Sequence, residues 1–413
     1  MMKRAHKTMT AAAAAAALVL AAPLQAQAQK TYDLQIQTAT PSSSLYFKLL
    51  QDFGDRLSTM SGGRFDVEVL PDGAVVGAFD ILDAVDNGVV EAGFAWPHYW
   101  SGKNAAYVLF SNVPASTGLD QRSLMSWFSR GGGLEMYRHL NQDIMGLNTV
   151  QFLVMPMGPD PLGWFKEPIN SMDDFREFKY RAPPGIAGKT YQEMGVSAVA
   201  MPGGDIVPSA ERGVIDAAEW IGPADDRNLG LDKIWKHYYI QGMHQATDIG
   251  ELQVNKDWWE SLPKDLQAIF ENAVMATTFK TYNANIHDNS EAIHEFQEGG
   301  VTVHDVPDSY FESFIKAQRK VTKEYTQQSE FFSEVLASQS DYASMVYPYW
   351  SRVQTLYANQ IRLAEEQKQS GTTDPRAAAG RAVGPPRAAW VRAGACRPGP
   401  GGWQPGTRWR ASD

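Results

Sequence analysis

The stretch from Tyr32 to Leu70 reads YDLQIQTATPSSSLYFKLLQDFGDRLSTMSGGRFDVEVL. Residues 32–37 alternate apolar and polar side chains, as a strand does, and residues 42–60 space their apolar side chains as an amphipathic helix opened by serine caps. Gly62-Gly63 ends that helix, and residues 64–70 contain Phe-x-Val-x-Val-Leu, the pattern of a second strand. This order of strand, helix and strand predicts an α/β fold with largely parallel sheets.

The same alternation continues through the middle of the chain. The body between two unusual ends has about 340 residues, which is too long for one ordinary domain and suits two. The expected elements are helices at 79–85, 121–140 and 187–194 and strands at 89–95, 148–155 and 179–181.

The last third of the body is helical. Helices are predicted at 264–298, 308–336 and 340–370. The third is amphipathic, and its apolar residues are Tyr347, Trp350, Val353, Leu356, Tyr357, Ile361 and Leu363. That apolar face either packs on its own domain or packs on a partner subunit, and the sequence leaves both open.

The first residues indicate the compartment. A positive start is followed by an apolar run from Thr10 to Ala22 and by the small residues Ala26-Gln27-Ala28. This is the pattern of a secretory signal peptide over residues 1–28, the alternative being an alanine-rich helix of the folded domain. No later apolar run reaches the length of a membrane span, so we predict a secreted, periplasmic protein.

The other end breaks with the body in composition. Residues 371–413 are rich in Ala, Gly, Pro and Arg and contain no lysine. The break predicts a disordered or aberrant tail, the alternative being a basic arm for an anionic surface. The only cysteine, Cys396, lies in this tail, so the folded body has no disulfide.

The body is strongly acidic. The chain has 37 basic and 47 acidic residues; ten of the basic and two of the acidic ones lie in the two ends, which leaves 27 against 45 and a net charge of −18. Nucleic acid and anionic lipid are therefore excluded as partners. A carboxylate ligand would need a local cation, because the global field opposes it.

Arg181 stands out in the segment Tyr180–Gly185, which reads Tyr-Arg-Ala-Pro-Pro-Gly. The arginine ends a short strand and precedes a turn and a helix, at the edge where open α/β sheets bind ligands. Its guanidinium can hold a carboxylate bidentately at any working pH. The alternative is an internal salt bridge.

Two further segments place functional groups after strands. Residues 213–223 contain Glu219-Trp220 before a Gly-Pro break, which suits a metal ligand or a pocket frame, or an ordinary strand edge. Residues 96–103, Trp-Pro-His-Tyr-Trp-Ser-Gly-Lys, follow the strand at 89–95 and suit a pocket wall or a core.

Together, Tyr99–Lys103, Arg181–Gly185 and Glu211–Trp220 resemble the solute receptors of TRAP transporters, the DctP family, and are most similar to the branch that binds α-keto acids and 2-hydroxy acids. The resemblance extends from about Tyr32 to Ala364. It implies a two-domain periplasmic-binding-protein clamp with hinge strands, a long connecting helix and an extended C-terminal helix. The implied bounds are 29–150 and 245–285 for the first domain, 151–244 and 286–335 for the second, and 336–370 for the C-terminal helix.

The resemblance also implies roles for site residues. Arg181 matches the arginine that grips the ligand carboxylate, and Glu219 and Trp220 match the segment that frames the ligand with a bound cation. His98 and Tyr99 match the pair at the ligand on the first domain, where many relatives carry two tyrosines. The implied aromatic walls are Tyr99, Trp164 and Trp220.

Two departures from the family pattern fall at expected cation-ligand positions. Asp160 stands where keto-acid-binding relatives usually have glutamine, and Gln245 stands where many have glutamate. With Glu219 and Trp220 they form the implied metal-ligand set. A ligand carboxylate, Asp160 and Glu219 against Arg181 leave a charge of −2, which favours Ca²⁺ over Na⁺.

The predicted function is that of a receptor that hands a small monocarboxylate, a 2-oxo or 2-hydroxy acid, to TRAP-type permease subunits, with a homodimer through the C-terminal helix. One alternative is a secreted hydrolase that uses a carboxylate pair, and another is a periplasmic sensor module. The sequence has no Gly-x-Ser-x-Gly elbow, and His294-Glu295 lacks the second histidine of a His-Glu-x-x-His motif. We therefore predict a binding protein and not an enzyme.

Overall fold

Helix α2 (Leu45–Ser61) and its flanking strands form as predicted. Ser44 caps the helix, its hydroxyl accepting from the Tyr46 amide at 3.1 Å, and Gly62 ends it with a φ of +66°. The strands on either side, β1 (Tyr32–Thr38) and β2 (Phe65–Leu70), pair in parallel. The computed structural model describes residues 30–111, 117–240 and 244–369, so the predicted signal peptide, the tail and Cys396 lie outside the described residues.

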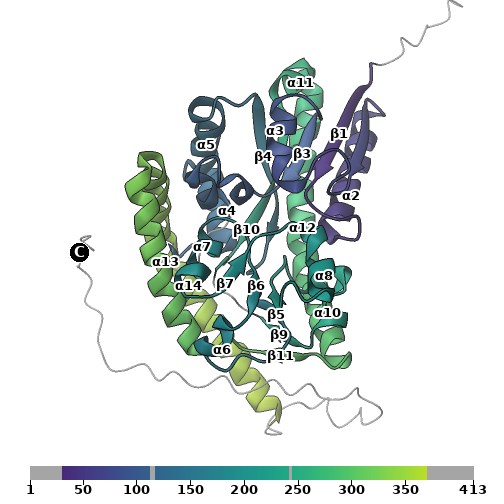
Figure 1. Ribbon diagram of the computed structural model, residues 1–413. Helices are drawn as coiled ribbons and strands as arrows, with labels where there is room; N and C mark the ends of the chain where they lie inside the picture. The colour runs from purple at the N-terminus through teal and green to yellow at the C-terminus, as the bar shows by residue number, and fades with distance from the viewer. Residues whose placement is uncertain (1–29, 112–116, 241–243, 370–413) are drawn as a thin grey trace, which may run out of the picture. The chain divides into compact units, whose positions relative to one another are not determined.

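The first sheet has the order β2-β1-β3-β10-β4. Its other strands are β3 (Ala92–Ala95), β4 (Thr149–Met157) and β10 (Asp248–Asn255). Strand β1 is parallel to β2 and β3, whereas β10 is antiparallel to both of its neighbours. The sheet lies in the upper half of Figure 1, and its strands come from distant parts of the chain.

The second sheet has the order β11-β9-β5-β8-β6-β7. Its strands are β5 (Gly163–Phe165), β6 (Lys179–Arg181), β7 (Ser197–Val199), β8 (Ala217–Ala218), β9 (His237–Tyr239) and β11 (Thr302–His304). Strand β5 is antiparallel to β8 and β9, and the remaining pairs are parallel. Each sheet thus contains one reversed strand, and its other strands share one direction, in agreement with the largely parallel sheets that the sequence predicted.

Helices surround the two sheets (Figure 1). The remaining helices are α3 (Ile81–Asp86), α4 (Gln121–Arg130), α5 (Gly133–Arg138), α6 (Met172–Arg176), α7 (Ile186–Glu193), α8 (Gly203–Glu211), α9 (Pro223–Leu229), α10 (Leu231–Ile234), α11 (Lys256–Ser261), α12 (Lys264–Glu298), α13 (Asp308–Gln328) and α14 (Glu330–Gln369). Short 3₁₀ segments occupy Ala78–Asp80, Pro97–Trp100 and Ala105–Phe110, and a π-helical turn occupies His139–Ile144.

Two helix predictions were wrong in where the helix breaks. The helix predicted at 121–140 is split after Arg130, because Gly132 adopts a φ of +84° and a Cβ on Gly133 would come within 2.6 Å of the Trp127 ring. The break predicted near residue 338 lies at Ser329 instead, whose hydroxyl accepts from the Phe332 amide at 3.1 Å and so caps α14.

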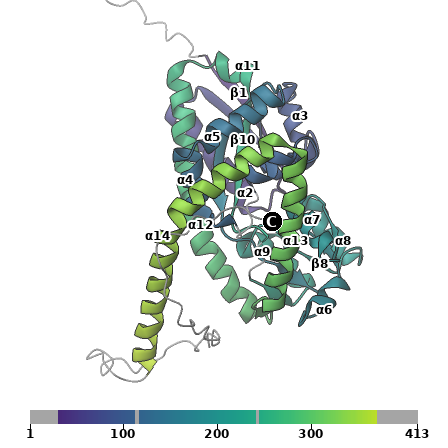
Figure 2. The same cartoon turned by 90° about the vertical axis from the view of Figure 1, so that its left-hand side faces the viewer.

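Helix α12 connects the environments of the two sheets. It packs on α2 and β4 near the first sheet and on α9 and β11 near the second. Figure 2 shows the first part of α14 crossing α4, where the Trp127 indole donates to the Ser338 hydroxyl at 3.1 Å. Within the described residues, no helix is both long and apolar enough to cross a membrane. The two-domain boundaries implied by the sequence stay a prediction.

A buried carboxyl lies in the middle of the first sheet. Glu251 on β10 is fully buried and accepts from the Trp100 indole at 3.0 Å, the Tyr137 hydroxyl at 2.7 Å and the Gln253 amide at 2.7 Å. Burial raises the pKa of Glu251 to about 7, and the three donors lower that pKa only in part. The folded protein therefore holds a proton here that the unfolded chain releases at lower pH.

We expect Glu251→Gln to flatten the dependence of stability on pH. Below about pH 4.5 both states of the wild type hold the proton; between about 4.5 and 7 only the folded state does, so stability falls as pH rises, by roughly 3 kcal/mol in total. A neutral glutamine removes this loss. The melting temperature of the variant should therefore fall less than that of the wild type between about pH 5 and pH 8, whereas the exposed control Glu260→Gln should follow the wild type. Parallel curves for wild type and Glu251→Gln would contradict the assignment.

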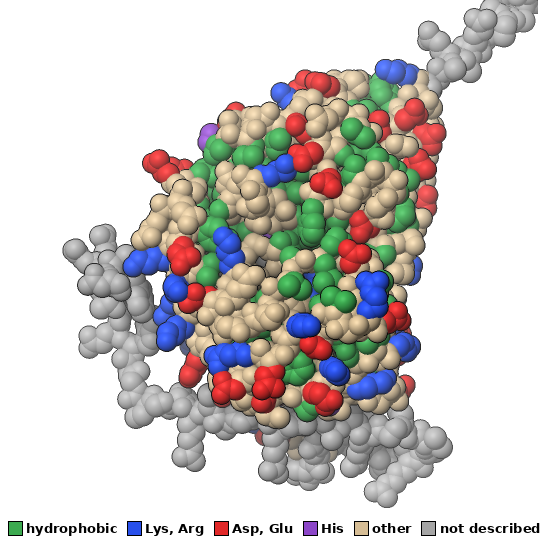
Figure 3. Space-filling model, viewed as in Figure 1, with side chains coloured by type: hydrophobic (Ala, Val, Ile, Leu, Met, Phe, Trp, Pro, Cys, Tyr) green, Lys and Arg blue, Asp and Glu red, His purple; other side chains and the backbone are tan. Residues whose placement is uncertain are grey.

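The charges of the body are dispersed over the visible surface. On the face shown in Figure 3, acidic and basic side chains are interspersed among polar and hydrophobic ones. This face presents no continuous basic surface of the kind that nucleic acid requires.

Candidate ligand-binding site

The residues predicted to bind ligand lie where strands of both sheets end. His98 and Tyr99 follow β3, Asp160 follows β4, Arg181 is the last residue of β6, Glu219 and Trp220 follow β8, and Gln245 precedes the reversed strand β10. Carboxyl ends of parallel strands are the edges at which open α/β sheets bind ligands. Strand pairing sets the register, since Arg181 lies opposite Ala218, and Met157 lies opposite Asp248.

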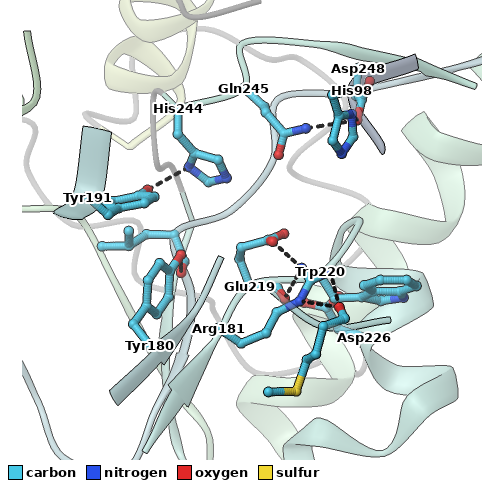
Figure 4. Close-up of polar contacts among 12 residues, drawn as sticks. His98, Tyr180, Arg181, Tyr191, Glu219, Trp220, Asp226, His244, Gln245 and Asp248 are labelled. Carbon is cyan, nitrogen blue, oxygen red and sulfur yellow. Dashed lines mark hydrogen bonds and ion pairs between the residues drawn. The ribbon is translucent and has the colours of Figure 1, made fainter. Parts of the chain in front are cut away.

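These edges line one small cavity, which holds about 260 Å³ of empty space when the part open to solvent is included. Its lining contains all seven predicted residues together with Trp96, Met157, Pro183, Ile221 and Asp248. The structure therefore brings the whole predicted set together. Figure 4 shows Gln245 and His244 on one side of this space and Arg181, Glu219 and Trp220 on the other.

Arg181 lies at the bottom of the site and is only 2% exposed. Its Nε and Nη2 donate to the Met201 carbonyl at 3.2 and 3.0 Å, and Nη1 donates to the main-chain oxygen of Glu219 at 3.1 Å. Nη1 also forms an ion pair with the Glu219 carboxylate, and the guanidinium carbon lies 5.2 Å from the centre of the Trp220 ring. The internal salt bridge that the sequence left as the alternative is thus present, and one N–H of Nη2 has no acceptor among the described residues.

Glu219 and Asp160 concentrate negative charge in this low-dielectric space. Burial raises the pKa of Glu219 to about 7, against the lowering effect of Arg181, and Asp248 raises it further. Burial, with Asp248, Glu219 and Asp226 nearby, also raises the pKa of Asp160 well above its usual range. The described residues thus hold more carboxylates here than one arginine can balance.

Two buried oxygens in the cavity have no hydrogen-bond partner among the described residues. They are Asp160 Oδ1 and Gln245 Oε1, on side chains only 3% and 2% exposed. A main-chain hydrogen bond of 3.0 Å from the Asp160 amide to the Gln245 carbonyl holds the two residues side by side. Because a buried oxygen without a partner is costly, both oxygens are suited to a ligand that the protein itself does not supply.

His244 is a residue that the sequence analysis missed. Its ring, Asp160 and Glu219 each offer one possible metal-ligand atom within 4.8 Å of the others, and all three residues are buried. The Tyr191 hydroxyl lies 2.9 Å from His244 Nδ1, which orients the ring. Its position directly before Gln245 was the only available signal, because no metal-binding spacing surrounds it.

The aromatic wall differs in part from the expectation. Trp220 lines the cavity, and its indole donates to Asp225 at 2.6 Å. Trp164 was wrongly predicted as a wall, because it lies outside the cavity lining and donates to Asp226 at 2.9 Å. Trp96 takes the place in the wall instead, with its ring centre 6.2 Å from that of Trp220.

The opposite wall carries a polar chain. His98 Nδ1 lies 3.0 Å from the Ser111 hydroxyl and 3.4 Å from Asp248 Oδ2. Asp248 also accepts from Ser111 and, at 2.8 Å, from the Gln245 amide. The cavity therefore combines one guanidinium, several carboxylate and amide oxygens and one oriented imidazole, an arrangement suited to holding a small anion together with a cation.

Comparison with known proteins identifies the family. The profile of "Bacterial extracellular solute-binding protein, family 7", named DctP, matches residues 36–328. The chain is 31% identical over 326 residues to a monocarboxylate 2-oxoacid-binding periplasmic protein of Nostoc sp., covering 78% of this chain and 86% of the relative.

Solved structures share the fold. A TRAP transporter solute-binding protein of Bordetella bronchiseptica, with calcium and picolinate, has a TM-score of 0.77 and 28% identity and covers 82% of this chain and 99% of its own. A TRAP solute-binding protein of Colwellia psychrerythraea, with calcium and pyruvate, has a TM-score of 0.74 and 26% identity and covers 80% of this chain and 100% of its own. A TRAP solute-binding protein of Pseudoalteromonas atlantica, with sodium and pyruvate, has a TM-score of 0.72 and 25% identity and covers 81% of this chain and 99% of its own.

These matches confirm the predicted α/β clamp with its long C-terminal helices and the prediction that the protein is not an enzyme. The hydrolase alternative is therefore set aside. The chain belongs to the DctP family of bacterial extracellular solute-binding proteins, the periplasmic receptors of TRAP transporters.

Proposed function

We propose that this receptor binds a small monocarboxylate, a 2-oxo or 2-hydroxy acid, through Arg181 and a bound cation. The observation that carries the proposal is the buried guanidinium in one cavity with two oxygens that lack partners, Asp160 Oδ1 and Gln245 Oε1. A ligand carboxylate would accept from the remaining N–H of Nη2 and share Nη1 with Glu219. The excess of carboxylates is the reason that a cation accompanies the anion.

The residues present suit a hard cation. Asp160, Glu219 and Gln245 offer carboxylate and amide oxygens, which such ions prefer. The indole N–H of Trp220 is donated to Asp225, so Trp220 would offer only its main-chain oxygen. The relatives bound to calcium or sodium support a cation at such a site, and the excess of carboxylates over the single arginine in this cavity favours the divalent ion calcium.

The size of the cavity supports a small ligand. The cavity holds about 260 Å³ of empty space even when the part open to solvent is included, which suits an acid of a few carbon atoms. The aromatic wall of Trp96, Tyr99 and Trp220 would exclude water around it. The names of the similar proteins, which include 2-oxoacid and pyruvate binding, support the same class of ligand. Closure of the two domains over the ligand would give the form that the permease subunits recognise.

A thermal-shift screen with small acids, in calcium and in sodium, tests the function. We expect short 2-oxo or 2-hydroxy monocarboxylates to raise the melting temperature without being consumed, because a ligand that binds only the folded state stabilises it. Dicarboxylates and uncharged amides of the same acids serve as controls. A screen in which no monocarboxylate shifts the melting temperature in either cation would contradict the proposal, and turnover of an acid would contradict the receptor role.

We also propose a homodimer formed partly by residues 340–370. The predicted apolar side chains of this segment are exposed, with Leu356 58% and Tyr357 67% accessible. Exposed apolar surface of this kind marks an interaction site. We expect a chain ending at Ser370 to form a dimer in light scattering and to retain ligand binding, because the tail from Gly371 onward should be dispensable. Leu356→Glu together with Tyr357→Glu should then give a monomer, whereas a monomeric parent chain would disprove the dimer.

A further inference from the structure

A hydrogen-bond chain on the cavity wall has a fixed direction. It consists of His98, Ser111 and Asp248, which are at most 3% exposed. The Asp248 carboxylate accepts from the Ser111 hydroxyl, from the Ile249 amide at 2.8 Å and from the Gln245 amide at 2.8 Å. Because a carboxylate only accepts, the single proton of the Ser111 hydroxyl is committed to Asp248.

This commitment places the proton of the His98 ring. The Ser111 oxygen, having donated its proton, can only accept from His98 Nδ1, which lies 3.0 Å away. Asp248 Oδ2, a second acceptor, lies 3.4 Å from the same nitrogen. Both neighbours of Nδ1 are acceptors, so the neutral ring carries its proton on Nδ1 and a lone pair on Nε2.

Nε2 of His98 is directed at the ligand space. His98 lines the cavity, and Nε2 has no hydrogen-bond partner among the described residues. In Figure 4 this nitrogen points away from Asp248 toward the space above Glu219 and Trp220. A buried side chain thus presents a hydrogen-bond acceptor to the ligand. Tyr99, its neighbour in the wall, can donate or accept and does not discriminate.

We propose that His98 makes the site selective for 2-hydroxy acids over 2-oxo acids. The proposal rests on the proposed function, with the ligand carboxylate at Arg181 and the substituent on C2 near the opposite wall. A hydroxyl donates its proton to Nε2, whereas a keto oxygen brings a lone pair against a lone pair and leaves both without a donor. A site built to receive a hydrogen bond rejects the analogue that lacks the donor, here by about 10-fold or more.

Calorimetric titration with matched acids at about pH 8, where a histidine is ordinarily neutral, tests the proposal. The probes are pyruvate against each enantiomer of lactate, and 2-oxobutyrate against each enantiomer of 2-hydroxybutyrate, in buffers containing calcium or sodium. Within each pair the carbon chain is the same, so the effect of ligand size on affinity is the same for both acids. We expect the more tightly bound enantiomer of each 2-hydroxy acid to have at least about 10-fold higher affinity than the 2-oxo acid of the same carbon chain.

His98→Gln removes the fixed acceptor, because its amide can turn either its oxygen or its nitrogen to the ligand. The preference should fall to within about threefold, while the exposed control His139→Gln should keep the wild-type ratio. A second measurement needs no variant: ¹⁵N NMR of histidine-labelled protein should show His98 protonated at Nδ1.

The outcomes distinguish the selectivity of His98 from the receptor function. Equal or tighter binding of the keto acids by the wild type, or a His98 proton on Nε2, would overturn the selectivity while leaving the receptor function standing. An unchanged ratio in His98→Gln would also overturn the role of His98. Failure of both series to bind would instead refute the proposed ligand class on which the inference rests.

Discussion

Arg181→Lys is expected to weaken binding of the monocarboxylate by roughly 30-fold to several thousand-fold, which corresponds to the loss of about 2–5 kcal/mol from a buried charge pair. A lysine ammonium is a point charge and cannot hold a carboxylate bidentately. It also cannot reach the Met201 carbonyl, the Glu219 carbonyl and the Glu219 carboxylate at once, as the guanidinium does. Part of the loss therefore comes from a disordered site and part from the missing contact with the ligand.

Calorimetry on Arg181→Lys measures the loss, and thermal unfolding without ligand separates the two parts. Arg227→Lys is the matched control, since Arg227 pairs with Glu295 at 2.8 Å on the partly exposed surface and does not line the cavity. This control should bind normally. Near-normal affinity in Arg181→Lys would remove Arg181 from the ligand site and leave it a structural role as the partner of Glu219.

Removal of the cation is expected to weaken binding by roughly 100-fold or more, because a ligand carboxylate would then join Asp160 and Glu219 around one arginine in a buried space. Calcium should restore full affinity to the wild type, whereas sodium would neutralise one negative charge fewer. Asp160→Gln lowers the negative charge by one, so sodium should then suffice. Chelation followed by titration with each cation measures both effects, with the exposed Asp173→Asn as the control.

The dependence on Asp160 can be contradicted directly. If sodium alone restores full binding to the wild type and Asp160→Gln changes nothing, the preference for calcium fails. The raised pKa of Asp160 gives the same experiment a second readout. A cation binds the ionised carboxylate, so cation binding should release protons, and the heat of binding should depend on the ionisation enthalpy of the buffer.

The first strand, helix and strand, β1, α2 and β2, could be predicted from the sequence because their local signals agreed with the tertiary structure. The serine cap, the helical spacing and the glycine pair set the limits of α2, and the alternation of β1 and β2 matched their pairing. Strand β10 was not recognised, although all eight of its residues are buried. Its core positions include Asp248 and Glu251, which accept hydrogen bonds from residues distant in sequence. Polar side chains at buried positions interrupt the hydrophobic periodicity, so the pattern did not indicate a strand.

In the site, too, residues with a local sequence signal were predicted, and contacts that depend on tertiary packing were not. Arg181 was found because the end of a strand before a turn is a local signal, whereas its partner contacts with Met201 and Glu219 depend on the packing of β6 beside β8. His244 was missed because only the fold brings it beside Asp160 and Glu219. The direction of the chain from Ser111 to Asp248 could not be read either, since the two residues are 137 positions apart.

Helix α12 has a consequence for how the protein comes apart. Its 35 residues form a rod about 52 Å long that packs on elements of both sheets. Phe270 of this helix packs on Phe53 and Phe152 beside the first sheet. Phe296, near the other end, packs on Trp164 and Tyr238 of the second sheet. Because loss of either sheet would leave part of one continuous helix without its packing, the body should melt as one cooperative unit. Amide protons in the middle of α12 should then exchange only through global opening, at a rate that reports the stability of the entire body.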